Sequence, residues 1–209
     1  MLKRSFDILA ASTTLLLALP LMAAIAVAVL VTMGRPVLYR QKRLGLDAQA
    51  FEIIKFRTMR TAKSEEAELF SDEQRVTRLG RMLRASSLDE LPELWLVVVG
   101  QMSLVGPRPL LPIYLELYRG EHWRRHEVRP GLTGLAQVNG RQDLTLKQRL
   151  DLDVDYVCRR RLRLDLTILL RTVVLVILGN GVRTGQSLAD IDDIGLAEAL
   201  SRNAEATQE

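Results

Sequence analysis

The sequence predicts an α+β fold that is mainly helical: a re-entrant membrane helix broken at a proline, followed by a cytoplasmic domain. An uncharged apolar segment of 27 residues runs from Ile8 to Gly34, with basic residues near both ends. Two strand-like stretches follow at 36–40 and 51–57, around a turn at 45–47. Apolar residues then recur with helical spacing. These patterns indicate a small β-hairpin among amphipathic helices, some of them at the membrane interface.

Composition narrows the classes of protein that this chain can belong to. A length of 209 residues suits one domain plus a membrane element. The net charge of +4 and the sequence pI near 9.5 favour anionic partners, such as lipid headgroups, nucleotides or nucleic acid. Because 5% of residues are aromatic and none alternate with a basic stripe, single-stranded nucleic acid is disfavoured. The single cysteine, Cys158, excludes an internal disulfide and fits a reducing compartment.

The apolar N-terminal segment is long enough to span a bilayer, since as one helix it would extend roughly 40 Å against a hydrocarbon core of about 30 Å. Pro20 lies in its middle and frees the carbonyl of Leu16, which favours a kink. A spanning helix usually has one end poor in Lys and Arg. Here both ends are basic, with Lys3 and Arg4 before the segment and Arg35, Arg40, Lys42 and Arg43 after it. We therefore predict a helix that enters the membrane, breaks at Pro20 and returns to the same face.

The second strand-like stretch ends in alternating cations and apolar residues, Lys55-Phe56-Arg57. On an extended chain Lys55 and Arg57 would point to one face and Phe56 to the other. A solvated strand edge protected by charge is an equal alternative to a binding role. The acid-rich residues at 61–78 predict a surface helix and loop.

An adjacent carboxylate pair, Asp89-Glu90, lies at the centre of the chain. Pro92 follows it and is tolerated only in the first turn of a helix, so the helix should begin between Ser87 and Asp89. Ser87 and Glu90 also have the spacing of a capping box. Acids at a helix start are common without any catalytic role. However, Arg84 precedes the pair and Arg108 follows it on a stiff Gly-Pro-Arg-Pro turn. These neighbouring arginines favour a role for the acids in binding a phosphate ester and a divalent cation over a role in packing alone.

The remaining patterns predict further helices and no second metal site. A helix is expected over 110–125. Its residue His122 lies four positions before His126, but a metal site needs at least three ligands. A second helix shows an apolar face at Leu146, Leu150, Val154 and Val157. The apolar run at 162–178 is interrupted by charges and predicts a core or interfacial helix, and 187–209 predicts a peripheral helix or frayed tail.

Four motifs in a fixed order are similar to those of a known family. The chain resembles the bacterial sugar transferases, the monotopic polyprenyl-phosphate phosphoglycosyl transferases of the bacterial inner (cytoplasmic) membrane. The resemblance covers about residues 3–179. It rests on the sequences KFRTM, RLGRMLRASSLDELPEL, GQMSLVGPRP and RPGLTGLAQVNGR.

The resemblance implies a reaction, a cofactor and a division of the chain. Family members transfer a sugar phosphate from a UDP-sugar to polyprenyl (undecaprenyl) phosphate at the lipid bilayer and require Mg²⁺. They do so through a covalent aspartyl intermediate, which starts a glycan on its lipid carrier. Residues 1–35 would be the re-entrant helix, 36–186 the catalytic domain facing the cytoplasm, and 187–209 an acidic tail. Carried over by position, Asp89 is the nucleophile, Glu90 is its partner at the metal, and the phosphates and nucleotide are bound by Lys55, Arg57, Arg84 and Arg108.

Two other classes of function are alternatives to the transferase. A membrane-anchored scaffold could hold anionic lipid through its basic face, and it would need neither Asp89 nor Glu90. A nucleic-acid-binding protein would need its basic residues on one face away from the membrane. The four motifs favour the transferase and predict no nucleic-acid partner.

Overall fold

The computed structural model describes residues 2–60, 75–140, 143–178 and 192–206, so most of the surface helix predicted at 61–78 lies outside it. As predicted, the described chain is mainly helical, with a long apolar N-terminal helix and a small antiparallel sheet. The α-helices are α1 (Leu2–Met33), α3 (Arg78–Ala85), α4 (Glu93–Val99), α5 (Leu135–Val138), α6 (Leu146–Arg159), α7 (Leu162–Ile177) and α9 (Leu196–Ala206). The strands are β1 (Leu38–Leu44), β2 (Ala50–Phe56), β3 (Ser103–Val105) and β4 (Gly131–Thr133). The 3-10 helices are η1 (Leu46–Ala48), η3 (Leu88–Glu90), η4 (Pro112–Leu117) and η5 (Gly120–Glu127).

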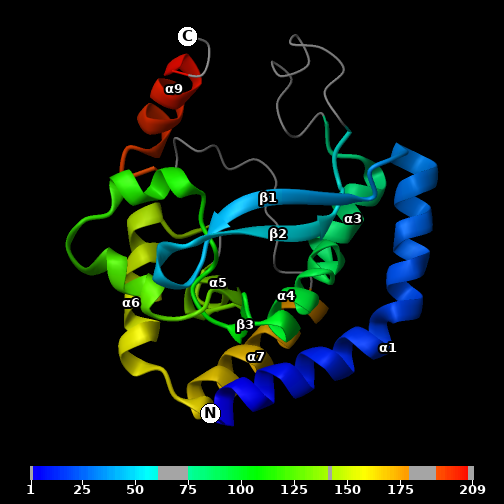
Figure 1. Ribbon diagram of the computed structural model, residues 1–209, viewed down its shortest axis with the longest axis horizontal. Helices are drawn as coiled ribbons and strands as arrows, with labels where there is room; N and C mark the ends of the chain where they lie inside the picture. The colour runs from blue at the N-terminus through cyan, green and yellow to red at the C-terminus, as the bar shows by residue number, and fades with distance from the viewer. Residues whose placement is uncertain (1, 61–74, 141–142, 179–191, 207–209) are drawn as a thin grey trace.

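Helix α1 runs along the bottom of the view and then up its right side, as two arms that meet at a bend (Figure 1), and Pro20 is an interior residue of this helix. We call the residues before Pro20 the first arm and those after it the second arm. Ala11 of the first arm is fully buried in the core cluster that contains α4 and β3. Val29 of the second arm is fully buried in a cluster with residues of β2 and α3. Leu17, between these two contacts, is 76% exposed. Both arms of α1 thus pack against the rest of the described chain, whereas Leu17 between these contacts is largely exposed.

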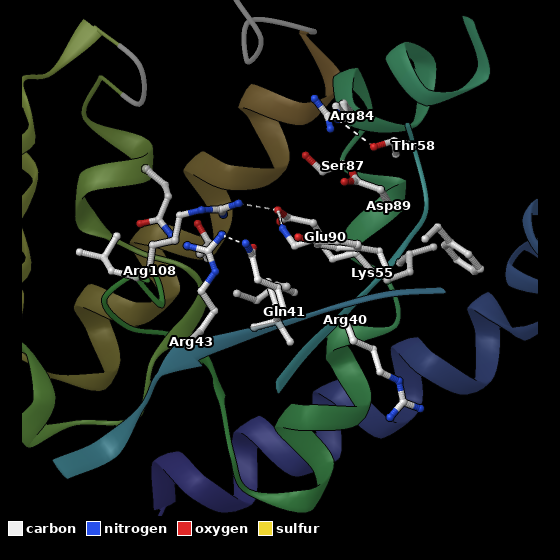
Figure 2. Close-up of a pocket in the computed structure, with 18 of the residues that line it drawn as sticks. Arg40, Gln41, Arg43, Lys55, Thr58, Arg84, Ser87, Asp89, Glu90 and Arg108 are labelled. Atoms are coloured by element: carbon white, nitrogen blue, oxygen red, sulfur yellow. Dashed lines mark hydrogen bonds and ion pairs between the residues drawn. The ribbon is translucent and has the colours of Figure 1, made fainter. Parts of the chain in front are cut away.

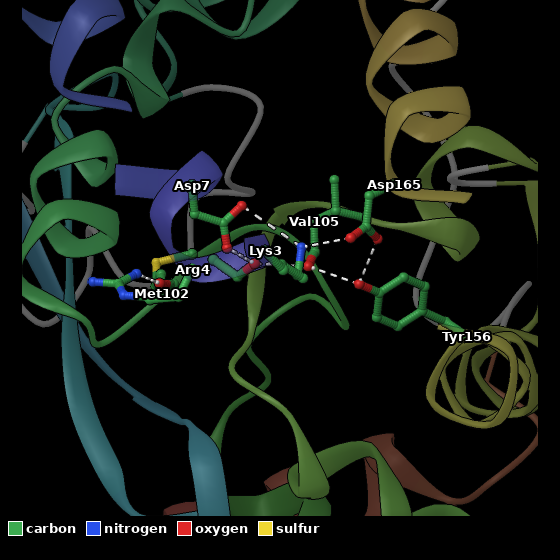
Figure 3. Close-up of polar contacts among 8 residues, drawn as sticks. Lys3, Arg4, Asp7, Met102, Val105, Tyr156 and Asp165 are labelled. Atoms are coloured by element: carbon green, nitrogen blue, oxygen red, sulfur yellow. Dashed lines mark hydrogen bonds and ion pairs between the residues drawn. The ribbon is translucent and has the colours of Figure 1, made fainter. Parts of the chain in front are cut away.

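Charged and hydrogen-bonded groups fasten the start of the first arm (Figure 3). Lys3 Nζ lies 2.8 Å from Asp165 of α7 and 3.6 Å from Asp7. The buried Asp7 accepts a 2.7 Å hydrogen bond from Ser103 Oγ of β3. Tyr156 of α6 donates to Asp165 at 2.8 Å. Because buried charges are tolerated only when paired and hydrogen-bonded, this network fixes the N-terminus of α1 against three other elements.

The β1–β2 hairpin confirms the two predicted strands and their turn, although β1 begins and ends later than the pattern indicated. Leu38 pairs with Phe56 and Leu44 with Ala50 in antiparallel register. The Leu44 N–H donates to Leu110 O at 2.9 Å. Because this bond lies at the end of the hairpin, it joins β1 to the chain that follows the Gly-Pro-Arg-Pro turn.

A parallel pair of short strands, β3 and β4, was not predicted from the sequence. Ser103 pairs with Gly131 and Val105 with Thr133. Gly106 and Gly131 allow the two chains to approach closely: a Cβ on Gly131 would lie 2.1 Å from Gly106 N, and a Cβ on Gly106 would lie 2.4 Å from Arg129 O. This contact brings the loop that carries Arg108 to the start of α5. Three-residue strands are too short to give a recognisable alternation of apolar and polar residues.

Two predicted helices differ from the structure. Ser87 adopts the left-handed conformation (φ 56°) and makes no side-chain cap bond, so the expected capping box with Glu90 is wrong. The carboxylate pair lies instead in the short η3, and α4 begins after Pro92, whose fixed φ suits a helix start. The helix predicted over 110–125 is two 3-10 helices, because Tyr118 and Arg119 between them have extended backbone (ψ 138° and 145°).

The C-terminal half confirms the predicted helices α6 and α7. Leu146, Leu150 and Val157 of α6 are buried, as its apolar face predicted. Helix α7 buries Ile168 but exposes several large apolar side chains: Leu162, Leu166, Leu170, Val173, Val174 and Ile177. Such a helix fits an interfacial position better than a core position. Helix α9 packs through Leu196 and Ala199 onto η4 and α6.

Replacing Gly131 by Ala should lower the free energy of unfolding by about 1–3 kcal/mol. The added methyl group meets backbone atoms of Gly106 and Thr133, which cannot shift without moving the chain that carries them. Thermal unfolding of the purified protein in detergent measures this change. Gly45→Ala is the matched control, since its methyl group meets mainly the ring of Phe51, a side chain that can shift. Equal melting temperatures for the Gly131 variant and the parent protein would contradict the assigned β3–β4 contact.

Candidate active site

The carboxylate pair opens into a cavity of about 1370 Å³ that the hairpin, η3, the loop after β3 and helices α5 to α7 surround (Figure 2). Among the described residues that line it, lysine and arginine side chains outnumber carboxylates by nine to three. A cavity with this balance of charge concentrates anions.

Glu90 is held by two cations from opposite sides of the site. Lys55 of β2 lies 2.5 Å from Glu90 Oε1, and Arg108 Nη2 lies 2.7 Å from the same oxygen. Burial alone would raise the pKa of Glu90, but the charges and hydrogen bonds of Arg108 and Lys55 lower it to about 2. Glu90 is therefore ionised at neutral pH and links the hairpin to the loop after β3.

Asp89 has a different environment from its neighbour. Its residue surface is 8% exposed, and its Oδ1 atom is buried without a hydrogen-bond partner among the described residues. Burial, followed by the negative charge of Glu90, raises the pKa of Asp89 to about 6, although the cations Lys55, Arg84 and Arg108 oppose this shift. An adjacent pair with pKa values pushed apart is a frequent property of catalytic carboxylates. The left-handed Ser87 just before η3 turns the chain so that both acids face the cavity.

The structure places three of the four predicted substrate-binding cations around the acids. Lys55 and Arg108 contact Glu90 directly. Arg84 of α3 lines the same cavity and donates from Nε to Thr58 Oγ1 at 2.9 Å (Figure 2). Their role in binding substrate stays a prediction, but the geometry brings them together as expected.

Arg57 also lines the cavity, but its hydrogen bonds point elsewhere. Its guanidinium donates to the carbonyl oxygens of Met33 at 2.5 Å, Gly34 at 2.6 Å and Arg35 at 3.2 Å. These carbonyls lie at the C-terminus of α1 and in the two residues that follow it, where the helix leaves backbone oxygens without intrahelical partners and a cation is stabilising. Within the described residues, Lys55 and Arg57 therefore bond to different groups, Lys55 to the acids and Arg57 to the end of α1, and β2 ends between them at Phe56.

The backbone of Arg108 is fixed from behind by a buried ion pair. Arg125 of η5 donates to Arg108 O at 2.6 Å and lies 2.7 Å from Asp153 of α6. Asp153 and Arg125 are both almost fully buried. The Gly-Pro-Arg-Pro turn is thus anchored on two other elements, which restricts where the Arg108 side chain can reach.

Sequence reasoning missed Glu93 and Arg43 as residues of this region. Glu93, one helical turn after Glu90, lies 3.4 Å from Lys55, and burial raises its pKa to about 7. Its spacing of three from Glu90 was the available signal. Arg43 of β1 faces the cavity and bonds to Gln41 Oε1 at 2.6 Å (Figure 2). The alternation of Gln41 and Arg43 on one strand face could have indicated it.

The two histidines make contacts away from the carboxylate pair. His122 Nε2 lies 3.0 Å from Asp151, and His126 bridges Gly45 O at 2.8 Å and the Tyr118 hydroxyl at 3.0 Å. Within the described ranges, no group of three or more His, Cys, Asp and Glu side chains is placed to hold a metal ion.

The class of protein that this fold and cavity define is that of the bacterial sugar transferases. The family model described as bacterial sugar transferase matches residues 1–179, and the chain belongs to this family. It is 43% identical over 182 residues to the uncharacterized sugar transferase EpsL of Bacillus subtilis, with 87% of this chain and 90% of that protein covered. It is 40% identical over 198 residues to the exopolysaccharide production protein ExoY of Rhizobium meliloti, covering 87% and 88%. It is also 42% identical over 181 residues to the UDP-glucose:undecaprenyl-phosphate glucose-1-phosphate transferase of Caulobacter vibrioides, covering 82% and 68%.

Arg57→Gln should lower the melting temperature, because three hydrogen bonds from a charged donor to the end of α1 are lost. The substitution should lower the free energy of unfolding by roughly 1–3 kcal/mol. For a chain of this size, 1 kcal/mol corresponds to about 2–4 °C, so the melting temperature should fall by several degrees. Arg84→Gln, which removes a bond to a hydroxyl on the same cavity wall, is the control and should shift the melting temperature less. An unchanged melting temperature together with weaker nucleotide binding would assign Arg57 to the ligand instead.

Proposed function

We propose that this protein transfers a sugar phosphate from a UDP-sugar to polyprenyl (undecaprenyl) phosphate and releases UMP. The observation that carries the proposal is Asp89: a buried carboxylate with a pKa near 6 and one oxygen that has no hydrogen-bond partner in the described part of the chain, beside a Glu90 that Lys55 and Arg108 hold ionised. The family and the names of the relatives support the same general reaction. The step would begin a cell-surface glycan on its lipid carrier.

The proposed chemistry proceeds in two displacements at phosphorus. A carboxylate oxygen of Asp89 attacks the β-phosphorus of the UDP-sugar, the bond from that phosphorus to the oxygen bridging the α-phosphorus breaks, and UMP leaves with the bonding electrons. The sugar phosphate is then held on Asp89 as an acyl phosphate. A phosphate oxygen of the polyprenyl phosphate next attacks this phosphorus, and the bond to Asp89 breaks to restore the carboxylate. With a pKa near 6, Asp89 is mostly ionised at neutral pH and available to attack.

The surrounding side chains would align and neutralise the phosphates, which is most of what phosphoryl transfer requires of a protein. Arg108, with its side chain 47% exposed to the cavity, keeps donors available beyond Glu90. Mg²⁺ is the proposed cofactor, and it would supply charge neutralisation at the diphosphate. Asp89 and Glu90 are suited to hold it, because Mg²⁺ is often bound by one or two carboxylates together with substrate phosphates. The unpartnered oxygen of Asp89 fits this donor set.

The alternative function, a membrane-anchored scaffold that binds anionic lipid without catalysis, leaves Asp89 unexplained. Burying a carboxylate without a partner costs free energy, and a scaffold gains nothing from it. The exposed apolar side chains of α1 and α7 fit both functions, so they do not separate them.

A covalent adduct would test the nucleophile directly. Incubating the wild type with a panel of UDP-sugars and Mg²⁺, without acceptor, should add one sugar phosphate to the intact mass of the protein. Asp89→Asn should form no adduct and lose turnover by several orders of magnitude, because the amide is a poor nucleophile of nearly the same shape. UMP release should stop when a chelator removes the metal.

The matched control is Asp47→Asn, which makes the same change at an exposed carboxylate of the hairpin turn. Both variants should keep the parent circular-dichroism spectrum and melting temperature within a few degrees. Full turnover by the Asp89 variant would remove this residue from the role of nucleophile, and a wild type that binds anionic lipid but consumes no UDP-sugar would favour the scaffold.

We also propose that α1 is re-entrant and that both of its ends face the cytoplasm at the bacterial inner membrane. Arg4 of the first arm donates to Val98 O at 3.1 Å and Met102 O at 3.3 Å, and Arg57 caps the second arm at Met33. A straight spanning helix would carry its ends to opposite sides of the bilayer, so one domain could not hold both. The uncharged parts of the two arms, residues 8–19 and 21–34, would each extend roughly 18–21 Å, a little more than half of the hydrocarbon core, so a tilted hairpin could turn within one leaflet.

Cysteine labelling in intact cells tests this topology. In a Cys158→Ser background, which removes an exposed thiol, single cysteines replace two exposed residues: Leu2 at the start of α1 and Tyr39 in β1, shortly after α1 ends. Both should resist a membrane-impermeant thiol reagent in intact cells and react after the cells are opened. Labelling of the Leu2→Cys protein in intact cells would show a spanning helix.

A further inference from the structure

The cavity continues past Arg108, away from Asp89, to a second group of cations. Arg43 reaches this end from β1 and Arg149 reaches it from α6, and both line the same cavity as Asp89 and Arg108. Figure 2 shows Arg43 beside Arg108, on the side of the site opposite to Arg84 and Asp89. Three guanidinium groups from three different elements therefore surround one part of the cavity.

Arg43 is a half-buried cation that has no ion pair within the part of the chain that the structure describes. Its assigned partner is the amide oxygen of Gln41 at 2.6 Å, and its Nε atom is buried without an acceptor. A buried charge is expensive unless an opposite charge accompanies it. Burial, followed by the positive charge of Arg108, lowers the pKa of Arg43, although Glu93 and two tyrosines oppose this shift.

Arg149 experiences the same repulsion from the other wall. Burial is the main cause that lowers its pKa, and the positive charge of Arg108 adds to it. Its helix is held in place because Leu146 and Leu150, on either side of it in α6, are buried against Tyr114. Because Arg43 and Arg149 stand on rigid elements, the fold keeps both of them in the same cavity as Arg108.

The end of the hairpin is fixed as firmly. The Leu44 N–H donates to Leu110 O at 2.9 Å, directly after the turn that presents Arg108. This bond therefore fixes the backbone of Arg43 relative to the backbone of Arg108. Positively charged donors that are held rigidly around one part of a cavity form a preorganised site for phosphate, which accepts several charge-assisted hydrogen bonds at once.

We propose that Arg43 and Arg149, together with Arg108, form a second phosphate subsite next to the one at Asp89. This inference rests on the proposed function for the identity of its ligand, which is a phosphate ester. Two sources share that chemistry: the α-phosphate of the UDP-sugar, which leaves as UMP, and the phosphate of the polyprenyl acceptor. Arg108 lies between the two subsites and contacts both.

Binding of UMP to the full-length protein in detergent, measured by calorimetry, provides the first arm of the test. Arg43→Gln and Arg149→Gln should each raise the Kd of UMP at least about tenfold, as expected for loss of a charge-assisted bond, whereas Arg43→Lys should recover part of the affinity. The controls are Lys42→Gln and Lys147→Gln, which remove the same charge from exposed positions on the same strand and helix. Both controls should bind UMP within twofold of the parent.

The second arm separates the two sources of phosphate. If the nucleotide occupies the subsite, the variants slow adduct formation from UDP-sugar and leave the reaction of preformed adduct with polyprenyl phosphate unchanged. If the acceptor occupies it, UMP affinity stays at the parent value and the KM for polyprenyl phosphate rises at least about tenfold, the same magnitude of loss. Either result supports a phosphate subsite at Arg43 and Arg149.

Two results would overturn the subsite. One is parent-like binding of UMP and parent-like KM for the acceptor in both glutamine variants. The other is a lower melting temperature in those variants with no change in either binding constant, which would make both residues purely structural. A wild type that binds UMP through Arg43 but forms no adduct would instead contradict the proposed function while the subsite stands.

Discussion

The double contact of Glu90 with Lys55 and Arg108 is the interaction on which the site depends. Lys55 comes from the hairpin and Arg108 from the turn after β3, so one carboxylate joins two parts of the chain that are far apart in sequence. With its pKa held near 2, Glu90 keeps its charge at any physiological pH. Its fixed charge also contributes to the raised pKa of Asp89. Without Glu90, the two cations would lie against Asp89 alone and favour its ionised form more strongly.

Behind this contact, buried polar groups act as anchors for the elements that carry the site. Arg125 and Asp153 fix the carbonyl of Arg108, and Lys3 and Asp165 fix the start of α1. Buried ion pairs contribute little net stability, because desolvation offsets most of the attraction. Their contribution here is geometric, since each pair joins elements that apolar packing alone would leave free to slide.

The amphipathic surfaces of the molecule relate the site to a lipid interface. The middle of α1 exposes Leu16 and Leu17, and α7 exposes Leu170 and Ile177. Thr172, on α7, lines the cavity and bonds to Thr133 at 2.7 Å. One wall of the cavity is therefore formed by a helix whose outer face is apolar. This arrangement suits a reaction between a water-soluble donor and an acceptor whose phosphate stays at the membrane surface.

The sequence by itself determined the long apolar helix, the hairpin, the helices α6 and α7, and the carboxylate pair between Arg84 and Arg108, while Lys55 was grouped with them only through the order of the family motifs. These features follow from local patterns: hydrophobic periodicity, turn residues and motifs of fixed order. Only the tertiary structure decided what depends on partners distant in sequence. It directed Arg57 to the end of α1, placed Ser87 in a left-handed turn in place of a cap, paired β3 with β4, and brought Arg43 and Arg149 to one cavity. A pattern gives the face on which a side chain lies, but the group that it meets is set by the packing of the whole chain.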